Sequence, residues 1–362
     1  MNFRIFLLFM CVFGASLSNA VPVIGLYEAE IKLPASEPED KILTKAFGLA
    51  VESVLVKVSG DKVAISADLL KEAKSKAPTW VAQHSVASLS ELLMSNGELV
   101  AGKQVRVAFY EASIDEFLSK NNLPVWGSDR PSSLVWLVNE DNGLRSLSGT
   151  KAPSEALNIL ARASGAIGLP VYAPLLDDED QRTISTTDVW GFFEDSILKA
   201  SERYQTDAVA ALKISNYVGK VSGGLLVLLK NGETERFDLS GDTLNDVLGL
   251  ASVHIAKVLS SRYAAVRSSD SINVLDVQVS GVSDYAIMRE TQSYLEALGV
   301  VKSVNLAQIS GENVRFSLEV NGDKERLLNG ISLNRLLVRE SPSTREVEDN
   351  NLIAYQYVGE IK

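Results

Sequence analysis

Apolar residues recur along this chain with two periods, one of three to four residues and one of two residues. These periods predict helices and strands in a layered α/β (α+β) protein. Residues 43–58 carry the helical period, and Ser59 and Gly60 are expected to end that helix. Ser66 is a suitable N-cap for a second helix. Strands are predicted at 22–33, 81–93 and 104–110. Together these elements form a predicted first domain at residues 21–122.

A second domain is predicted at residues 123–266, with the order strand, helix, strand, helix, strands, helix. Its buried strands are expected at 133–139, a continuous apolar run, and at 207–214, and its helices at 153–163, 189–204 and 242–259. Asp188 is expected to cap the helix at 189–204. The dipeptide Asn231-Gly232 predicts a hairpin between two further strands.

A third domain is predicted at residues 271–340, where strands and helices follow the order βαββαβ. That order is the one found in the ferredoxin-like sandwich. Residues 341–362 are polar and acidic and are interpreted as a tail, with one more strand expected at 352–358.

The amino terminus has the three parts of a secretory signal peptide. Arg4 supplies a positive charge, residues 5–17 are mostly apolar, and Ser18 and Ala20 are small residues at a cleavage site. The sequence therefore predicts cleavage after Ala20 and a periplasmic protein. Its one cysteine, Cys11, lies in the segment that is removed.

The charge of the chain limits its partners. The net charge is −11, and removal of the signal peptide takes away only Arg4 among charged residues, which makes it −12. Such a balance disfavours nucleic acid and anionic lipid as general partners. No segment after the signal peptide has 18 uncharged apolar residues in a row, so no transmembrane helix is predicted.

Several short motifs resemble those of an exported proteobacterial family, the domain of unknown function numbered 2066. They are LPVWGSDRP at 123–131, PLLDDED at 174–180, DVWG at 188–191 and ASERY at 200–204. The resemblance implies a location in the Gram-negative cell envelope and implies no activity. The second domain also resembles the amino-terminal domain of the periplasmic propeller protein of the Tol–Pal system, a likeness of fold only.

Catalytic motifs are scarce. Ser196 and Lys199 match Ser-x-x-Lys, the spacing at which a lysine one helical turn away can take a serine's proton. Both residues are predicted outside the apolar stripe of their helix. A solvated helix face is the simpler interpretation, and a serine hydrolase that uses Ser196 and Lys199 is kept as an alternative.

No metal or cofactor is predicted. The mature chain has two isolated histidines, His84 and His254, and no cysteine, which does not make a familiar zinc site. Asp177, Asp178 and Asp180 belong to the densest acidic cluster, but the spacing is not that of a calcium loop. A solvated turn is the simpler interpretation, and a surface for a cation or a basic partner is the alternative.

Trp126 and Arg130 lie at the predicted junction of the first two domains. Trp126 is expected to wedge between the domains and Arg130 to pair with a carboxylate. The leading hypothesis is a non-enzymatic binding or assembly factor of the cell envelope. Its candidate contact residues are Trp126, Arg130, Asp177, Asp178 and Asp180. A protein that binds a small ligand at a domain cleft is the second alternative.

Overall fold

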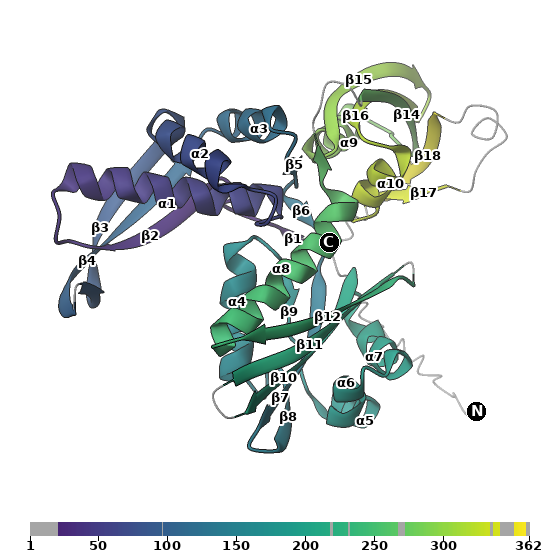
Figure 1. The fold of residues 1–362 in the computed structure, drawn as a ribbon. Helices are drawn as coiled ribbons and strands as arrows, with labels where there is room; N and C mark the ends of the chain where they lie inside the picture. Colours follow the sequence, from purple (N-terminus) through teal and green to yellow (C-terminus); the bar gives the residue numbers. More distant parts are fainter. Residues whose placement is uncertain are drawn as a thin grey trace, which may run out of the picture.

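The computed structural model describes residues 21–95, 97–217, 220–230, 232–266, 272–333, 336–340 and 351–359. The predicted signal peptide, residues 1–20, lies outside the described residues. Within the described part of the chain, no helix is both long and apolar enough to cross a membrane. The described elements form a mixed α/β structure with three main sheets, and Figure 1 shows them as three lobes that meet near β5 and β6.

The first lobe is an antiparallel sheet with strand order β2-β4-β3, covered on one face by α1. Its elements are β2 (Glu28–Pro34), α1 (Glu39–Ser59), α2 (Ala67–Trp80), β3 (Val81–Ser95), β4 (Glu98–Phe109) and α3 (Glu111–Lys120). Gly60 ends α1 in the left-handed conformation, and the Ser66 side chain caps α2 by accepting from Leu69 N–H. Both predicted boundaries are therefore confirmed.

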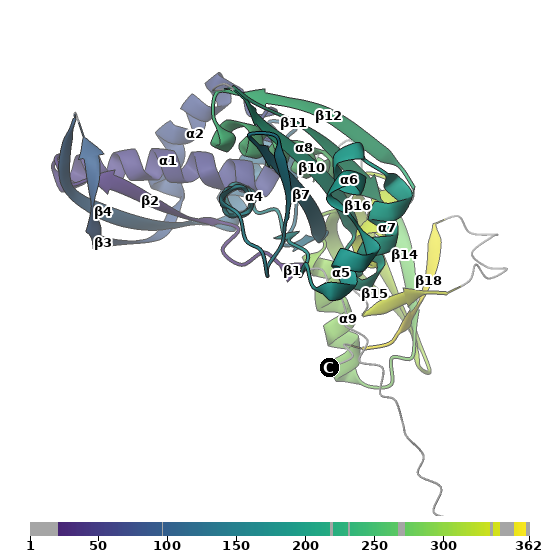
Figure 2. The ribbon, with the colours of Figure 1, turned by 90° about the horizontal axis from the view of Figure 1, so that it is seen from below.

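The second lobe has three layers. Its sheet runs β12-β11-β10-β7-β8, with β9 beside the first residues of β7, and β7 and β10 are parallel. Helices α4 and α8 cover one face, and α5, α6 and α7 cover the other (Figure 2). The strands are β7 (Ser133–Asp141), β8 (Leu144–Ser148), β9 (Val171–Tyr172), β10 (Ala208–Tyr217), β11 (Lys220–Leu229) and β12 (Thr234–Gly241). The helices are α4 (Glu155–Ala166), α5 (Asp178–Thr183), α6 (Thr186–Gly191), α7 (Glu194–Ser201), the 3₁₀ turn η1 (Glu202–Tyr204) and α8 (Leu244–Tyr263).

The single helix predicted at 189–204 is wrong. Ser185, not Asp188, is the N-cap of α6, and Asp188 completes a capping box by accepting from the Ser185 N–H. Phe192 then takes the left-handed conformation, with φ of 56°, and ends α6 before α7 begins. Both short helices bury side chains on this face of the sheet, Val189 from α6 and Ile197 from α7.

The third lobe is a sheet with strand order β15-β16-β14-β18-β17, packed against α9 and α10. Its elements are β14 (Ile272–Ser280), α9 (Tyr285–Ala297), β15 (Val301–Ser310), β16 (Asn313–Asn321), α10 (Lys324–Ser332), β17 (Leu337–Arg339) and β18 (Leu352–Tyr357). The strand predicted within the acidic tail is therefore present, although residues 341–350 and 360–362 lie outside the described residues.

The ferredoxin-like arrangement is not confirmed. In that arrangement the fourth strand would lie antiparallel to the first, but here β18 lies beside β14 and runs parallel to it. Strand β17 is displaced to the edge, where it pairs with β18. The physical reason is burial. Ile353 and Tyr355 of β18 are almost wholly buried in the lobe's core, so the strand after the βαββαβ unit takes the central position.

Candidate functional site

Residues 123–130, here called the junction segment, contact all three lobes at the centre of the molecule (Figure 1). Leu123 and Val125 are buried in the core of the first lobe, whereas Trp126 is buried in the core of the second. The N–H of Trp126 donates to the carbonyl oxygen of Val58 at the end of α1, at 2.8 Å. Neighbouring residues of one short segment thus belong to two different cores.

The junction segment also contacts the third lobe and the first described strand of the chain. Strand β5 (Pro124–Val125) pairs with β13 (Ala265–Val266), which precedes the third lobe, and β6 (Asp129–Arg130) pairs with β1 (Val21–Pro22). A Cβ atom on Gly127 would lie 3.1 Å from the backbone nitrogen of Gly299, so the two backbones touch. This contact leaves little space for a side chain at that position.

Trp126 has the wedge position that the sequence predicted. Its side chain is 1% exposed, and a Cβ atom on Gly60 would lie 2.3 Å from its Cε3 atom. The end of α1 therefore needs glycine at position 60 both for its left-handed φ of 68° and for the space that the indole occupies. The indole Nε1 is buried without a hydrogen-bond partner among the described residues.

Arg130 is wholly buried and binds backbone carbonyl oxygens from both of the lobes that it joins. The acceptors and distances are Gly127 at 3.1 Å from Nε, Ile167 at 3.1 Å and Gly168 at 2.9 Å from Nη1, and Lys57 at 2.6 Å and Trp126 at 3.1 Å from Nη2. Its guanidinium also stacks 4.3 Å from the centroid of the Trp126 ring. The expected carboxylate partner is therefore wrong, because carbonyl groups occupy its hydrogen-bonding positions.

Helix ends stabilise this buried charge. Lys57 lies in the last turn of α1 and Ile167 is the C-cap of α4, so the negative ends of two helix dipoles point at the guanidinium. Burial lowers the pKa of Arg130 to about 9, which leaves it charged at neutral pH. Burial, and then the charge of Arg130, lower the pKa of the neighbouring Lys57 ammonium.

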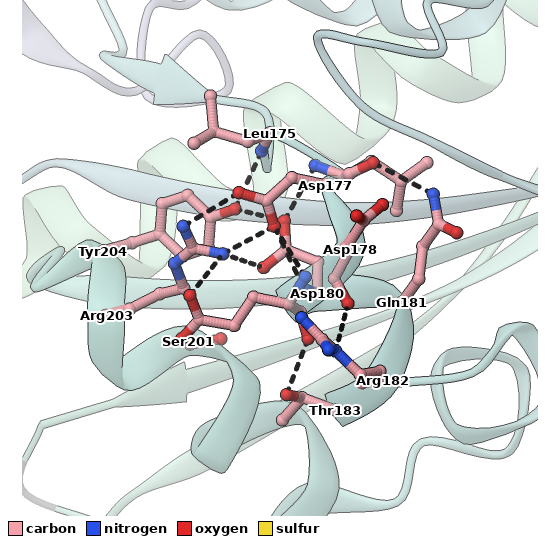
Figure 3. Close-up of polar contacts among 12 residues, drawn as sticks. Leu175, Asp177, Asp178, Asp180, Gln181, Arg182, Thr183, Ser201, Arg203 and Tyr204 are labelled. Carbon is pink, nitrogen blue, oxygen red and sulfur yellow. Dashed lines mark hydrogen bonds and ion pairs between the residues drawn. The ribbon is translucent and has the colours of Figure 1, made fainter.

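The acidic cluster forms a second polar centre, on the other face of the second lobe (Figure 3). Asp177 caps α5 by accepting from the N–H groups of Glu179 and Asp180. Arg203, in η1, donates to both carboxylate oxygens of Asp177, at 2.7 and 3.0 Å, and to Asp180 at 3.1 Å. Sequence reasoning placed Arg203 in a motif but did not identify it as the partner of this cluster.

Asp180 is the buried member, with 1% of its side chain exposed. Its Oδ2 atom accepts from the Leu176 N–H at 2.7 Å and from the Tyr204 hydroxyl at 2.5 Å. Burial, and then the hydrogen bond to Asp180, raise the pKa of Tyr204. The interpretation as a solvated turn is therefore wrong for Asp177 and Asp180. Their carboxylates connect α5 to η1 through hydrogen bonds from Arg203 and Tyr204. Asp178 has an exposed side chain and stays a candidate for surface contacts.

Stability should depend on pH through Asp177. Hydrogen bonds from Arg203, and then from the Asp180 N–H, hold the pKa of Asp177 well below its ordinary value of 3.8. Its contribution is therefore present above 3.8 and is lost as the pH falls below that value, because the unfolded chain binds the proton first. We expect Asp177→Asn, which keeps a cap, to be less stable than the wild type at neutral pH, with the difference shrinking in acid.

Urea unfolding at neutral pH and at a pH well below 3.8 measures this difference. Asp178→Asn is the matched control, because that exposed side chain has no ion pair among the described residues. If the difference in unfolding free energy between Asp177→Asn and the wild type stays constant with pH, the Asp177 carboxylate is not the source of the pH dependence.

Ser196 and Lys199 both lie on α7, where Ser196 is half-buried and Lys199 is exposed. Among the contacts of the described residues, none joins the serine hydroxyl to the lysine ammonium. No group of three or more His, Cys, Asp or Glu side chains suited to a metal ion is found in the described ranges.

A cleft of about 790 Å³ lies between the second and third lobes. One wall comes from the end of β11, Glu233 just before β12, and the end of α8, and the other comes from α10, β17 and β18. The lining residues are Asp207, Leu229, Lys230, Glu233, Arg262, Tyr263, Glu325, Leu328, Asn329, Ser332, Leu337, Val338, Arg339 and Tyr355. Sequence reasoning named a domain cleft as an alternative but none of these residues.

The wall from the second lobe carries ion pairs. Lys230 Nζ lies 2.7 Å from Asp207 Oδ1, and the other oxygen of Asp207 accepts from the N–H and hydroxyl of Ser132. Arg262 pairs with Glu233, and its Nε is a buried donor with no hydrogen-bond partner among the described residues. Burial, and then the charge of Asp207, raise the pKa of the neighbouring Tyr263 to about 12, so its hydroxyl keeps its proton at neutral pH.

Comparison with protein families changes the interpretation of the sequence. The model of a family described as a domain of unknown function (DUF8605) matches residues 20–127, which span the first lobe and the start of the junction segment. This match corrects the expected resemblance to the family numbered 2066, and no similarity to the Tol–Pal protein is found. No curated protein matches the chain.

The motifs behind the earlier resemblance have structural roles in this fold. Residues 123–131 contain the junction segment, and PLLDDED and ASERY supply the two sides of the Asp177–Arg203 ion pair. Short motifs that serve packing and capping do not identify a family by themselves.

Proposed function

We propose that this protein is an exported, non-enzymatic binding protein that holds a segment of another cell-envelope protein in the cleft between its second and third lobes. The observation that carries the proposal is the cleft of about 790 Å³, a size within the range of ligand sites. Its location in the periplasm rests on the signal-peptide pattern of residues 1–20.

Both walls of the cleft mix charged and apolar side chains. The wall from the second lobe presents the ion-paired Lys230 and Arg262, and the wall from the third lobe presents apolar Leu328 and Val338 beside Glu325 and Arg339. An extended peptide suits both walls, since alternate side chains of a strand point in opposite directions.

The junction segment and the acidic cluster support this function by positioning rather than by contact. Trp126, Arg130 and Asp180 are at most 1% exposed, so a partner does not reach them without unfolding. Their hydrogen bonds set the orientation of the lobes and the helices around the sheet.

A photo-reactive amino acid in place of Val338 tests the proposal in living cells. Val338 lies in the cleft and is 49% exposed, so we expect a specific crosslink to one envelope protein. The same substitution at Val63, which is exposed in the first lobe, is the matched control and should give no such product.

Equal crosslinking from both positions, or none from Val338, would contradict the cleft as the binding site. A small molecule that raises the melting temperature without any protein crosslink would favour the small-ligand alternative. Cell fractionation with sequencing of the mature amino terminus tests export separately, and Val21 is the expected first residue.

A further inference from the structure

A small polar pocket lies on the face of the third lobe's sheet that α9 and α10 do not cover. On that sheet Val277, Val314 and Phe316 point to the covered face, where they are buried in the lobe's core. Their neighbours along the same strands point to the opposite face, because successive side chains of a strand alternate. The pocket has a volume of about 130 Å³, and we call it the Arg315 pocket. The residues that line it are Gln278, Gln308, Ser310, Asn313, Val314 and Arg315.

Three strands bring the polar side chains of the pocket together. Arg315 on β16 is paired with Gln278 on β14 and with Gln308 on β15. Ser310 is paired with Asn313 two positions further along the same β15–β16 pair. Paired residues of antiparallel strands have their side chains on the same face, and so do residues two positions apart on one strand. The five polar side chains therefore lie on one face, although Gln278 and Arg315 are 37 positions apart in the chain.

The two cross-strand neighbours of Arg315 do not neutralise its charge. Opposite charges at such positions stabilise a sheet, but here both neighbours are glutamine. Arg315 Nη2 donates a long hydrogen bond to Gln278 Oε1, at 3.4 Å. Within the described ranges no carboxylate forms an ion pair with Arg315. The register places one acidic residue, Asp276, diagonally beside it, at a typical separation of about 7–8 Å.

Other arginines of this chain have partners that Arg315 lacks. Those that pair with a carboxylate include Arg106, Arg145, Arg203, Arg236 and Arg262. Arg130 and Arg326 donate to backbone carbonyl oxygens instead. In the part of the chain that the structure describes, Arg315 has neither kind of partner, although it is half-buried. Its guanidinium can therefore take acceptor atoms from a ligand.

The chemistry and the size of the pocket select the ligand. Its guanidinium, amide and hydroxyl groups all donate hydrogen bonds, and no carboxylate lines it. An ionised carboxylate only accepts hydrogen bonds, and its two oxygens match the planar fork of an arginine. A volume of about 130 Å³ holds about four waters at about 30 Å³ each, which is the size of a carboxylate group with the carbon that carries it. One negative charge also matches the single positive charge of Arg315, whereas a phosphate dianion exceeds it beside Asp276.

We propose that the Arg315 pocket binds a carboxylate, with the guanidinium donating to its two oxygens and the side-chain amides of Gln278 and Gln308 on either side. Ser310 and Asn313 supply further donors at one end. The carboxylate belongs either to a free small acid or to the carboxyl terminus of a peptide, since both present the same group. This site shares no lining residue with the cleft of the proposed function and goes beyond that function.

Nuclear magnetic resonance of the purified, deuterated chain tests the proposal through the side-chain N–H signals of Arg315, Gln278 and Gln308. The probes are acetate, N-acetyl-trialanine with a free carboxyl group, and the same peptide with a carboxyl-terminal amide. We expect both carboxylates to shift these signals, and the amide peptide to bind at least about tenfold more weakly, because it loses charge-assisted hydrogen bonds. Tighter binding of the acid peptide than of acetate assigns the site to a peptide terminus, and equal binding assigns it to small acids.

The variant Arg315→Gln should weaken carboxylate binding at least about tenfold while the melting temperature stays close to that of the wild type. Arg289→Gln is the matched control, because Arg289 is exposed on α9 and its described side-chain partner is Gln292. Asp276→Asn should bind carboxylates about two- to fivefold more tightly, because it removes the diagonal negative charge. This gain does not depend on the stability of Arg315→Gln.

Several results would overturn the proposal. Unshifted pocket signals with both carboxylates at millimolar concentrations would exclude the site. Equal binding of the acid and amide peptides would exclude recognition of the charge, and an equal loss in Arg315→Gln and Arg289→Gln would exclude this arginine. Inorganic phosphate that shifts the signals when neither carboxylate does would contradict the class of ligand. None of these measurements involves the cleft, so the Val338 experiment remains independent.

Discussion

The Arg130→Met variant is expected to lose roughly 3–5 kcal/mol of unfolding free energy, as is typical when one partner of a buried charged network is removed. Methionine keeps the apolar stem but donates no hydrogen bond. It leaves carbonyl oxygens of Lys57, Ile167 and Gly168 without this donor, at about 1–3 kcal/mol for a buried acceptor that stays unbonded. The individual costs do not add, because the acceptors share one donor group.

Chemical denaturation of the purified chain, with probes in each lobe, measures this loss. The unfolding free energy of Arg130→Lys should lie between those of Arg130→Met and the wild type. Lysine keeps the positive charge, but its ammonium cannot donate to five acceptors in one plane. Arg182→Met is the matched control: its side chain is exposed, so a change within about 0.5 kcal/mol is expected. An Arg130→Met protein as stable as the wild type would show that the guanidinium does not hold the lobes together.

The Trp126→Ala variant is expected to lose roughly 3–5 kcal/mol, the usual cost of truncating a buried aromatic side chain. The indole fills the space between Gly60 at the end of α1 and the core of the second lobe, and it also stacks on Arg130. Alanine would leave a cavity between two lobes. We expect the first lobe to unfold at a lower denaturant concentration than the rest of the chain.

Trp126→Phe separates the effect of volume from that of the polar atom. The indole Nε1 has no hydrogen-bond partner among the described residues, so phenylalanine removes a buried donor without breaking a described bond. The expected loss is therefore well below that of alanine, at about 1 kcal/mol. Near-ultraviolet circular dichroism together with thermal unfolding measures both variants. Equal losses for the two would contradict this account.

Local signals in the sequence predicted helix ends correctly where a single residue type controls the local backbone conformation. Gly60 ends α1 and Ser66 starts α2, because the left-handed conformation and side-chain capping depend on those residues alone. The same reasoning failed at 189–204. There the apolar stripe continues through the break at Phe192, and only the capping box of Ser185 and Asp188 marks a separate short helix.

The candidate sites were harder to predict, since their partners are distant in the chain. Asp177 and Arg203 are 26 positions apart, and Arg130 binds oxygens up to 73 positions away. The sequence showed the acidic run at 177–180 and the lone Arg130. It did not show that Arg203 pairs with the acidic run, or that backbone carbonyl groups bind Arg130. A domain cleft was named as an alternative, but its lining residues could not be predicted, because its walls come from separate lobes.

The sequence by itself determined most of the helices and strands, the end of α1, the start of α2 and the wedge position of Trp126, because these depend on neighbours within a few residues. The tertiary structure decided the central place of β18, the partners of Arg130 and Asp177, and the cleft. These features depend on which surfaces are buried against one another. Burial is a property of the packed lobes, so a local pattern of polar and apolar residues does not contain it.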